Sequence, residues 1–447
     1  MKRYFLLGHP LGHSLSRPLH MGLFAALGVK AEYSLMDTPA PQLQRAVDTL
    51  RERSDGFNVT IPYKEKILPF LSKTDAASSL IGAVNTVAVQ KGQLLGYNTD
   101  AAGFAFALDA CGIACAGKKA VVLGAGGVAR MMAAELARMG ARVDIAARDI
   151  GKARRLAEDL KRRGLSRAPG VASLAELSGG YDLIFNGTPV GMHPDTDASP
   201  VTEKALDGAS AVFDTIYNPA QTQLMRMAGG LGIKAAGGLV MLAAQAAAAQ
   251  EIWTGRRHRR EDVLAVCEPL AARLRLSGRN IVLCGMPGSG KTTLGRRVAE
   301  ATGLDFIDLD AAIEKRHGMS VSDIFARLGE DYFRKEEALE ARRAAGRTHT
   351  VIATGGGTLL NPQSAAALKR NGLVVFLDAQ PETLAKRLGN EAGRPLLRGD
   401  DLLERLCALW RQRRPSYLAA ADIRIEDGGV EQQCRNLYRA ITEGALL

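Results

Sequence analysis

The feature that most constrains this chain is the segment 285–292, which reads Gly-Met-Pro-Gly-Ser-Gly-Lys-Thr. An apolar run typical of a strand, residues 280–284, precedes it, and a sequence typical of a helix continues from Thr293. This order of strand, GxxxxGK[ST] loop and helix predicts a loop whose backbone N–H groups bind phosphates at a helix N-terminus. The lysine of such a loop reaches the β and γ phosphate oxygens, and the hydroxyl after it binds Mg²⁺. The residues expected to bind ATP are Gly288, Ser289, Gly290, Lys291, Thr292 and Thr293, with Thr292 also at the metal.

A second nucleotide signature lies far upstream, in residues 119–129. This segment reads Lys-Ala-Val-Val-Leu-Gly-Ala-Gly-Gly-Val-Ala, a strand-like run followed by G-x-G-x-x-A. In dinucleotide-binding folds such glycines allow a tight turn and a close approach of the backbone to the pyrophosphate. We therefore expect Gly124, Gly126 and Gly127 to contact a dinucleotide. One chain with two different nucleotide sites predicts two linked reactions.

Length and composition narrow the class of protein further. A chain of 447 residues predicts two to three domains, and short apolar runs that alternate with helical patterns predict α/β architecture. No apolar run approaches the roughly 18 residues of a membrane helix, and the N-terminal apolar run stops at His9. We therefore expect a cytoplasmic protein without a membrane partner. The net charge of +11 comes from dispersed basic residues with few aromatic residues among them, so we expect no nucleic-acid partner.

Short polar motifs are spread through the first 100 residues. Ser14 and Ser16 are two residues apart, so in an extended segment both hydroxyls can face one anionic group. Lys64 follows a strand-like segment, and Asp100 ends a polar cluster. A lysine beside a carboxylate can relay a proton, and the ion pair fixes the position of the lysine. An ordinary surface ion pair is worth only about 0–1 kcal/mol, so it is the combination of these motifs that indicates a site.

Together these motifs resemble those of shikimate dehydrogenase, over roughly residues 1–255. The resemblance is carried by the segments His13–Ser16, Asn58–Thr60, Lys64, Gly82–Thr86, Asn98–Asp100, Gly124–Gly127, Asn186–Met192, Asp214–Pro219 and Gly238–Gln245. It implies a substrate domain formed by residues 1–103 and 237–255, with a Rossmann dinucleotide-binding domain at 104–236 inserted between them. It also implies reduction of 3-dehydroshikimate to shikimate, with Lys64 and Asp100 as the catalytic pair. The residues that it implies for substrate binding are Ser14 and Ser16 at the carboxylate, and Thr60, Asn85, Tyr217 and Gln245 at the ring hydroxyls.

The choice of dinucleotide depends on the end of the second strand of that inserted domain. Arg148 matches the arginine with which the family binds the 2′-phosphate of NADP, and Lys152 adds a second positive charge. Asp149 stands where the family commonly has threonine, and a carboxylate repels a phosphate. We expect NADP(H), with an NAD-using quinate/shikimate dehydrogenase as the alternative. Arg17 and Met21 also depart from the family pattern, beside the two serines, where they can alter affinity for the substrate.

Further motifs follow the phosphate-binding loop. Residues 306–310 predict a strand that ends in Asp-x-Asp, with both carboxylates on one face because side chains alternate along a strand. Arg334 lies in a helical pattern, and another strand-like run leads into the three glycines Gly355–Gly357. Glycines there permit a ligand to approach the backbone closely. A Gly- and Arg-containing loop at 393–397 is typical of a lid, and Arg413 opens the sequence Arg-Arg-Pro-Ser-Tyr.

These motifs resemble those of shikimate kinase, over roughly residues 279–440. The resemblance implies an adenylate-kinase-like P-loop domain at 279–447, joined to the first half by a linker at 256–278. Catalysis in such an enzyme depends mainly on positioning and electrostatics. The implied roles are Asp310 at the hydroxyl to be phosphorylated, Asp308 at Mg²⁺, Arg334 and Arg413 at the shikimate carboxylate, Gly355, Gly356 and Gly357 along the substrate pocket, Arg394 at the transferring phosphoryl group, and Arg387 near adenine.

The two resemblances support each other, because the first reaction makes shikimate and the second consumes it. We expect a bifunctional enzyme of aromatic amino-acid biosynthesis that uses NADPH, ATP and Mg²⁺ on small-molecule substrates. The alternative from another class is a regulatory protein that senses metabolites of the pathway with one degenerate site. The intact residues that argue against it are Lys64, Asp100, Lys291, Thr292, Asp308 and Asp310.

Overall fold

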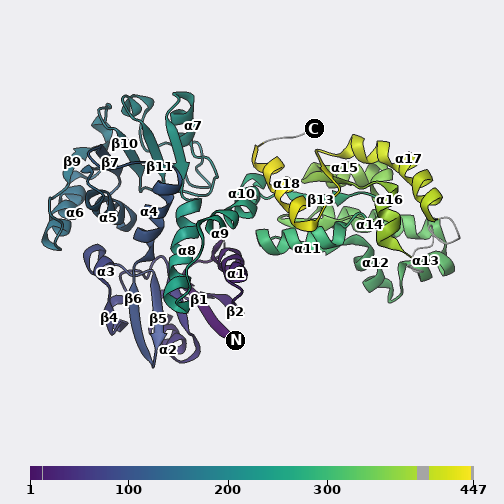
Figure 1. Ribbon diagram of the computed structural model, residues 1–447, viewed down its shortest axis with the longest axis horizontal. Helices are drawn as coiled ribbons and strands as arrows, with labels where there is room; N and C mark the ends of the chain where they lie inside the picture. The colour runs from purple at the N-terminus through teal and green to yellow at the C-terminus, as the bar shows by residue number, and fades with distance from the viewer. Residues whose placement is uncertain (13, 390–401, 444–447) are drawn as a thin grey trace. The chain divides into compact units, whose positions relative to one another are not determined.

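The computed structural model describes residues 1–12, 14–389 and 402–443. It divides between Cys267 and Glu268 into two compact units (Figure 1). The first unit contains two six-stranded sheets, and the second contains one five-stranded sheet. This confirms the α/β class expected from the sequence.

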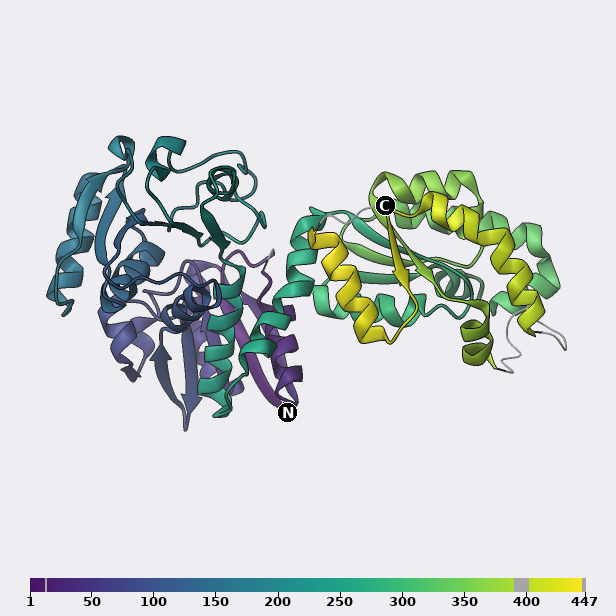
Figure 2. The ribbon, with the colours of Figure 1, turned by 45° about the horizontal axis from the view of Figure 1, so that its top comes forward.

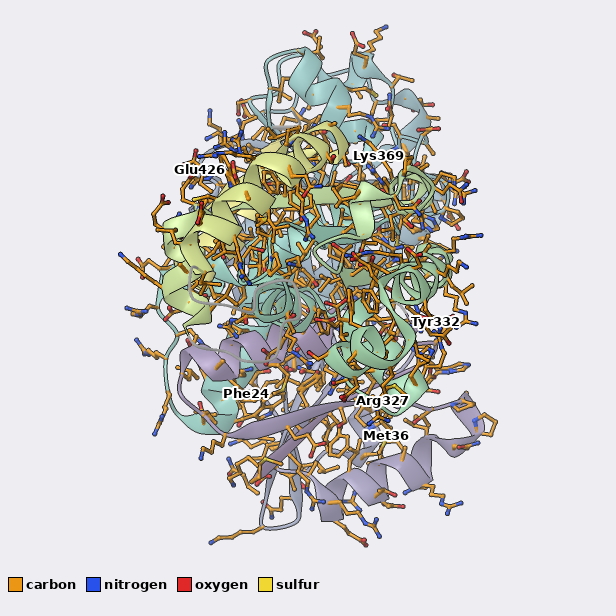
Figure 3. The ribbon with its side chains drawn as sticks, turned by 90° about the vertical axis from the view of Figure 1, so that its right-hand side faces the viewer. Phe24, Met36, Arg327, Tyr332, Lys369 and Glu426 are labelled. Carbon is orange, nitrogen blue, oxygen red and sulfur yellow. The ribbon has the colours of Figure 1, made fainter. Side chains whose placement is uncertain are left out.

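The first sheet has the strand order β2-β1-β3-β5-β6-β4. Its elements are β1 (Lys2–Gly8), α1 (Ser16–Ala26), β2 (Ala31–Asp37), α2 (Leu43–Arg53), β3 (Gly56–Val59), β4 (Lys73–Thr74), α3 (Ala76–Ile81), β5 (Thr86–Gln90) and β6 (Gln93–Tyr97). Successive residues of β1 point to opposite faces. Leu6 belongs to the core under α1, where Phe24 stacks on Tyr4 with ring centroids 5.2 Å apart, and Leu7 belongs to the core under α2. Figure 3 labels Phe24 in this part of the chain.

The pairing of these strands gathers several loops at one edge of the sheet. β1 and β3 are parallel, with Leu7 opposite Val59, so their carboxyl ends lie together. β5 is antiparallel to both β3 and β6, so the start of β5 and the end of β6 lie at the same edge. The segments that follow β1, β3 and β6 and the one that precedes β5 therefore meet there.

The second sheet is parallel throughout, in the order β12-β11-β10-β7-β8-β9. Read from the other edge, this is the 3-2-1-4-5-6 order of the Rossmann fold. Its elements are β7 (Lys119–Leu123), α5 (Gly127–Arg138), β8 (Arg142–Ala147), α6 (Ile150–Arg162), β9 (Gly170–Ser173), β10 (Leu183–Asn186), β11 (Ala211–Asp214), α7 (Gln223–Gly230) and β12 (Lys234–Gly237). Ligands of such sheets bind where the strand order reverses, here between β7 and β10.

Two helices connect the sheets of the first unit. α4 (Thr99–Ala110) and α8 (Leu239–Thr254) pack along each other, as both ribbon views show (Figures 1 and 2). α9 (Arg260–Ala265) packs against α8, and Val266 after it contacts Gly22 of α1. The range 256–278, predicted to be a linker, therefore begins with residues that pack on the first unit. The domain boundaries themselves stay predictions.

The sheet of the second unit has the order β14-β15-β13-β16-β17 and is parallel. Its elements are α10 (Cys267–Leu276), β13 (Asn280–Cys284), α11 (Lys291–Thr302), β14 (Asp305–Asp308), α12 (Leu309–His317), α13 (Val321–Leu328), α14 (Glu330–Ala345), β15 (Thr350–Ala353), α15 (Pro362–Arg370), β16 (Gly372–Asp378), α16 (Pro381–Leu388), α17 (Leu402–Ala420), β17 (Ile423–Glu426) and α18 (Val430–Glu443). Ile281 and Val282 of β13 face different cores, one with α11 and α18 and the other with α14 to α17. Among the described residues no helix is long and apolar enough to cross a membrane.

Candidate active sites

Lys64 and Asp100 form an ion pair at the edge of the first sheet where the loops gather. Lys64 Nζ lies 2.6 Å from Asp100 Oδ2, and 29% of the lysine side chain and 17% of the aspartate side chain are exposed. Lys64 lies in the loop after β3, and Asp100 lies in the first turn of α4. The pair is thus neither an exposed surface bridge nor sealed from solvent, as a group that exchanges a proton with a substrate requires.

Asn85 joins this pair to α8. Its Nδ2 donates to Asp100 Oδ1 at 2.8 Å and lies 3.3 Å from Gln245 Oε1, and its Oδ1 accepts from the backbone N–H of Thr99 at 2.8 Å. Asn85 is buried, so its amide cannot rotate freely to water. The structure therefore brings together three of the predicted residues from three segments: Asn85, Asp100 and Gln245.

A buried polar layer that the sequence did not reveal lies beneath Asn85. Asn58 Nδ2 donates to the carbonyl of Asn85 at 3.1 Å and to Thr86 Oγ1 at 2.9 Å, and its Oδ1 accepts from Tyr33 at 2.8 Å. The ring of Tyr33 stacks on that of His20 with centroids 4.0 Å apart. Burial lowers the pKa of His20 to about 3, so the imidazole is neutral at physiological pH. The residues of this layer come from distant segments, so no spacing within one segment could have revealed it.

The other predicted substrate residues of the first unit lie in the loops that follow β1, β3 and β11. Ser16 opens α1, and its N–H donates to Ser14 Oγ at 3.2 Å, so both serines sit at the same helix start in the loop after β1. Thr60 follows β3 directly and is bonded to β1 through Leu7 O. Tyr217 is half-buried in the loop after β11, which is bonded to the start of α8. The serines and Thr60 thus share one sheet edge with the ion pair.

The glycines of the dinucleotide signature lie between β7 and α5. Gly126 caps α5, and Gly127 is its first residue. Among the described residues, no atom comes within 4 Å of where a Cβ would lie on either glycine, so the backbone there is open to a ligand. A helix N-terminus with open space before it suits a pyrophosphate, and the residues present therefore fit a dinucleotide.

The charged residues at the end of β8 have distinct roles in the local structure. Arg148 and Lys152 are both exposed. Asp149 is the N-cap of α6, and its Oδ1 accepts from the backbone N–H of Lys152 at 3.1 Å. Aspartate and threonine are both good N-caps. The acidic residue at 149 thus has a structural function that does not require a ribose.

A buried carboxylate that was not predicted as a site residue organises the next two loops of this sheet. Asp214, at the end of β11, accepts hydrogen bonds from Asn186 Nδ2 at 3.0 Å, Thr222 Oγ1 at 2.7 Å and the N–H of Ile216 at 3.1 Å. Burial raises its pKa to about 6. Asn186 in turn accepts from the N–H of Thr188 at 2.9 Å. This group fixes the loop that carries Tyr217.

In the second unit, the phosphate-binding loop has the expected form. Gly288 and Gly290 have φ angles of +81° and +90°, which favour glycine, and α11 begins at Lys291. Lys291 Nζ donates to the carbonyls of Gly285 and Met286, each at 3.0 Å, so the ammonium group lies over the loop. Ser289 Oγ is buried, and no hydrogen-bond partner for it is found in the described part of the chain. A polar atom of this kind at a helix N-terminus fits a bound phosphate.

The two aspartates of the Asp-x-Asp motif are not both on a strand, and the prediction that they share one strand face is wrong. β14 ends at Asp308, and Asp310 lies in the first turn of α12. Asp308 Oδ1 accepts hydrogen bonds from the N–H groups of Asp310 and Ala311. These bonds cap α12 and end the strand. The other carboxylate oxygen of Asp308 accepts from Thr292 Oγ1 at 2.6 Å, which places the two predicted metal ligands together.

The two predicted carboxylate-binding arginines differ in their surroundings. Arg334 Nη1 donates to Glu337 at 2.8 Å, and its Nη2 donates to Glu330 at 2.9 Å. Arg413 is only 5% exposed, and its Nη1 donates to the carbonyl of Gly356 at 3.0 Å. No carboxylate forms a salt bridge with Arg413 among the described residues. Glu337 was not predicted, although its position one helical turn after Arg334 is a signal for such a pair.

One cleft of about 820 Å³ in this unit collects most of the predicted kinase residues. Its lining includes Gly288 to Thr293, Asp308, Asp310, Arg334, Gly356, Gly357, Arg387 and Arg413. Gly355 lies beside it, because a Cβ there would come within 2.7 Å of Asp310 Oδ1. Arg387 pairs with Asp427 at 2.8 Å at the rim. Arg394 lies outside the described residues.

Comparisons with known proteins agree with this geometry in both units. The sequence profile described as the shikimate dehydrogenase substrate binding domain matches residues 6–87, and that of shikimate / quinate 5-dehydrogenase matches residues 107–193. The shikimate kinase profile matches residues 287–442.

Individual relatives resemble the first unit. The NADP(+) shikimate dehydrogenase of Symbiobacterium thermophilum is 42% identical over 264 residues, which are 56% of this chain and 88% of that protein. The crystal structure of a chorismate mutase/shikimate 5-dehydrogenase fusion protein from Clostridium acetobutylicum is 34% identical, with a TM-score of 0.58, and covers 62% of this chain and 99% of that one. The shikimate 5-dehydrogenase of Thermus thermophilus, solved with NADP(H) and shikimate, is 36% identical, with a TM-score of 0.56, and covers 60% of this chain and 98% of that one.

Proposed function

The chain belongs to the shikimate dehydrogenase family and carries a shikimate kinase domain after it, and we propose how its residues divide the two reactions. It is an enzyme of the shikimate pathway with shikimate dehydrogenase and shikimate kinase activities.

In the dehydrogenase half, the chain's residues hold a ring ketone and give a proton to its oxygen, while bound NADPH supplies the hydride. Lys64 donates this proton, because among the described residues its Nζ pairs with one carboxylate, Asp100 at 2.6 Å, and keeps further N–H groups for the substrate. Asn85 holds Asp100 in place and, with Gln245, faces the ring hydroxyls. Ser14 and Ser16, together at the start of α1, bind the substrate carboxylate.

The dinucleotide of this half is NADP(H). Gly124, Gly126 and Gly127 bind the pyrophosphate, and the exposed cations Arg148 and Lys152 bind the 2′-phosphate. The carboxylate of Asp149 is turned back onto the N–H of Lys152 as the cap of α6, which accounts for an acidic residue at this place in an NADP site. An NAD-dependent enzyme would need that carboxylate to face the ribose 2′-hydroxyl instead.

In the kinase half, bound ATP with Mg²⁺ supplies the phosphoryl group, and the chain positions the attacking hydroxyl. Thr292 and Asp308 hold the metal, since their side chains are already 2.6 Å apart. Asp310 accepts a hydrogen bond from the shikimate hydroxyl that is phosphorylated. Arg334 and Arg413 bind the shikimate carboxylate through charge-assisted hydrogen bonds. The glycines Gly355–Gly357 leave room for the ring. Arg387 would contact the adenine when ATP is bound, and Arg394 would neutralise charge on the transferring phosphoryl group.

The observation that carries this proposal is that each unit assembles a set of groups for its own step, the Lys64–Asp100–Asn85 cluster in one and the phosphate loop with Asp308 and Asp310 in the other. The test supplies the purified chain with 3-dehydroshikimate, NADPH, ATP and Mg²⁺. We expect oxidation of NADPH, formation of 3-phosphoshikimate, and accumulation of shikimate when ATP is left out. Shikimate that forms with NADH as readily as with NADPH would reject the cofactor assignment, and failure to phosphorylate supplied shikimate would reject the kinase assignment.

A further inference from the structure

An arginine of the dinucleotide-binding layer contacts the segment that leads to Asn85. Arg163, directly after α6, donates from Nη1 to the carbonyl of Ser79 at 3.0 Å. Its guanidinium group also covers Gly82, where an added Cβ would lie 3.1–3.2 Å from three guanidinium atoms. Gly82 ends α3 with a φ of +74°. The contact therefore fixes both the last turn of α3 and the residue at which the chain changes direction toward Asn85.

The position of Arg163 is itself fixed by Asp159. Arg163 Nε donates to Asp159 Oδ2 at 2.8 Å, and Arg130 of α5 donates to the same oxygen. The hydrogen bonds from Arg130 and Arg163 hold the pKa of Asp159 below its usual value, so the carboxylate stays charged. Arginine is suited to this arrangement, because its planar fork can bond a carboxylate with one edge and a carbonyl with another.

These bonds connect the two ligand sites proposed for this half. At one end, the N–H of Arg130 donates to the carbonyl of Gly126, in the glycine loop that opens α5. At the other end, the residues after Gly82 are bonded to the catalytic centre: the N–H of Val84 donates to the carbonyl of Lys64 at 2.8 Å, and Asn85 holds Asp100. A displacement of the segment 79–85 would therefore move both partners of the ion pair.

We propose that Arg163 is a positioning residue of the dehydrogenase reaction: held by Asp159 of the dinucleotide layer, it fixes the segment 79–85 so that Asn85 and Lys64 meet the substrate. The inference rests on the substrate-binding role proposed for Asn85. Arg163 touches neither substrate nor cofactor in this scheme, so its loss should weaken the capture of 3-dehydroshikimate and leave that of NADPH nearly unchanged.

The adjacent residue provides a matched control. Arg162 also pairs with Asp159, at 3.2 Å, but its side chain is 76% exposed, and in the described part of the chain it makes no hydrogen bond to the substrate layer. The two arginines are consecutive in the sequence at the end of α6, and each carries one positive charge. Each variant loses one positive charge and one partner of Asp159. A difference between their kinetic constants therefore reports the contact of Arg163 with Ser79 and Gly82.

The experiment measures steady-state kinetics of reduction by the full chain. For Arg163→Ala we expect the KM for 3-dehydroshikimate to rise roughly 5- to 20-fold, at the lower end of the range for one charge-assisted hydrogen bond because the site is partly exposed, with the KM for NADPH changed less than about twofold. Arg162→Ala should match the wild-type chain in both constants. Phosphorylation of supplied shikimate, measured in the same preparation, should be unchanged because Arg163 lies in the first unit. Equal constants for the two variants, or an equal rise in both KM values of Arg163→Ala, would overturn the proposal.

Two further variants separate the contact with Ser79 from an effect of charge or of folding. Arg163→Lys keeps the charge but replaces the planar fork of two separate donors by a single ammonium group, so its KM for 3-dehydroshikimate should be intermediate. This variant also serves if Arg163→Ala does not fold. In an Asn85→Ala background, replacement of Arg163 should add little, because both changes act on one contact. If Asn85→Ala alone leaves the KM for 3-dehydroshikimate unaltered, the role proposed for Asn85 fails. If the effect of Arg163→Ala is fully retained in that background, Arg163 does not act through Asn85.

Discussion

Arg413 and Arg334 are both proposed to bind the shikimate carboxylate, yet their surroundings predict unequal contributions. Arg334 is already paired with Glu330 and Glu337, so a substrate carboxylate must compete for its guanidinium group. Arg413 is buried against the carbonyl of Gly356 and forms no salt bridge among the described residues, so its positive charge is available to an anion. The replacement Arg413→Met should therefore cost more affinity for shikimate than Arg334→Met.

The magnitude follows from the kind of bond that is lost. A charge-assisted hydrogen bond contributes about 1.5–3 kcal/mol. For Arg413→Met this corresponds to a dissociation constant for shikimate that is larger by roughly 10- to 150-fold. For Arg334→Met we expect the dissociation constant for shikimate to rise roughly fivefold or less, because this arginine is partly exposed and already paired with two glutamates. The fold should survive the first change, because the carbonyl of Gly356 keeps its second donor, Tyr417 Oη, at 2.5 Å.

Calorimetric titration of each variant with shikimate and, separately, with ATP would measure these losses. Arg411→Met, an exposed change on the same helix α17, is the matched control and should bind shikimate as the wild-type chain does. Affinity for ATP should change little in any variant, because the loop proposed to bind its phosphates, 285–292, is separate from both arginines. The reasoning is refuted if Arg334→Met weakens shikimate binding as much as Arg413→Met, or if Arg413→Met chiefly weakens ATP binding.

Three further outcomes follow from the first unit. Lys64→Ala should lower the rate of reduction by about 10²–10⁴-fold while phosphorylation of supplied shikimate stays intact; near-normal reduction would remove Lys64 from the mechanism. Arg148→Ala should raise the KM for NADPH far more than that for NADH, and equal effects would show that this side chain does not bind the 2′-phosphate. His20 is neutral in the folded state, with a pKa of about 3 against 6.5 when unfolded, so the unfolded state gains a proton first as the pH falls. Lowering the pH from 6.5 to about 5 should thus lower the free energy of unfolding by about 2 kcal/mol through His20. Urea unfolding of His20→Gln should show a smaller decrease over this pH range. An equal decrease in both chains would contradict a neutral, buried His20.

Much of the candidate machinery could be predicted from the sequence because its chemistry is local. The glycines at 288 and 290 are needed where the backbone takes positive φ angles, and Lys291 and Thr292 follow them at a fixed spacing at the start of α11. The same holds for the loop between β7 and α5. Local requirements of this kind leave a signature within about ten residues, so the two glycine loops and the α/β class could be predicted from the sequence alone. That these loops bind nucleotides stays a prediction.

The sequence pattern gave a wrong or doubtful prediction where a side chain accepts hydrogen bonds from backbone N–H groups. The alternation of residues 306–310 predicts a strand through Asp310, but Asp308 bonds the N–H groups of Asp310 and Ala311 and starts α12. A capping aspartate and a strand aspartate look alike in one sequence, since both follow an apolar run. Asp149, whose carboxylate caps α6, raised a doubt about the cofactor for the same reason.

The sequence by itself determined which chemical groups this chain has and where its glycine-rich loops precede a helix. Only the tertiary structure decided which groups meet: Asn85 with Gln245, which is 160 residues away, Asp308 with Thr292, and Arg163 with the end of α3. It also decided that Arg334 is compensated by a buried glutamate, whereas no such partner of Arg413 is found among the described residues. The physical reason is that such contacts depend on strand order and on helix packing between distant segments, and no spacing within one segment encodes them.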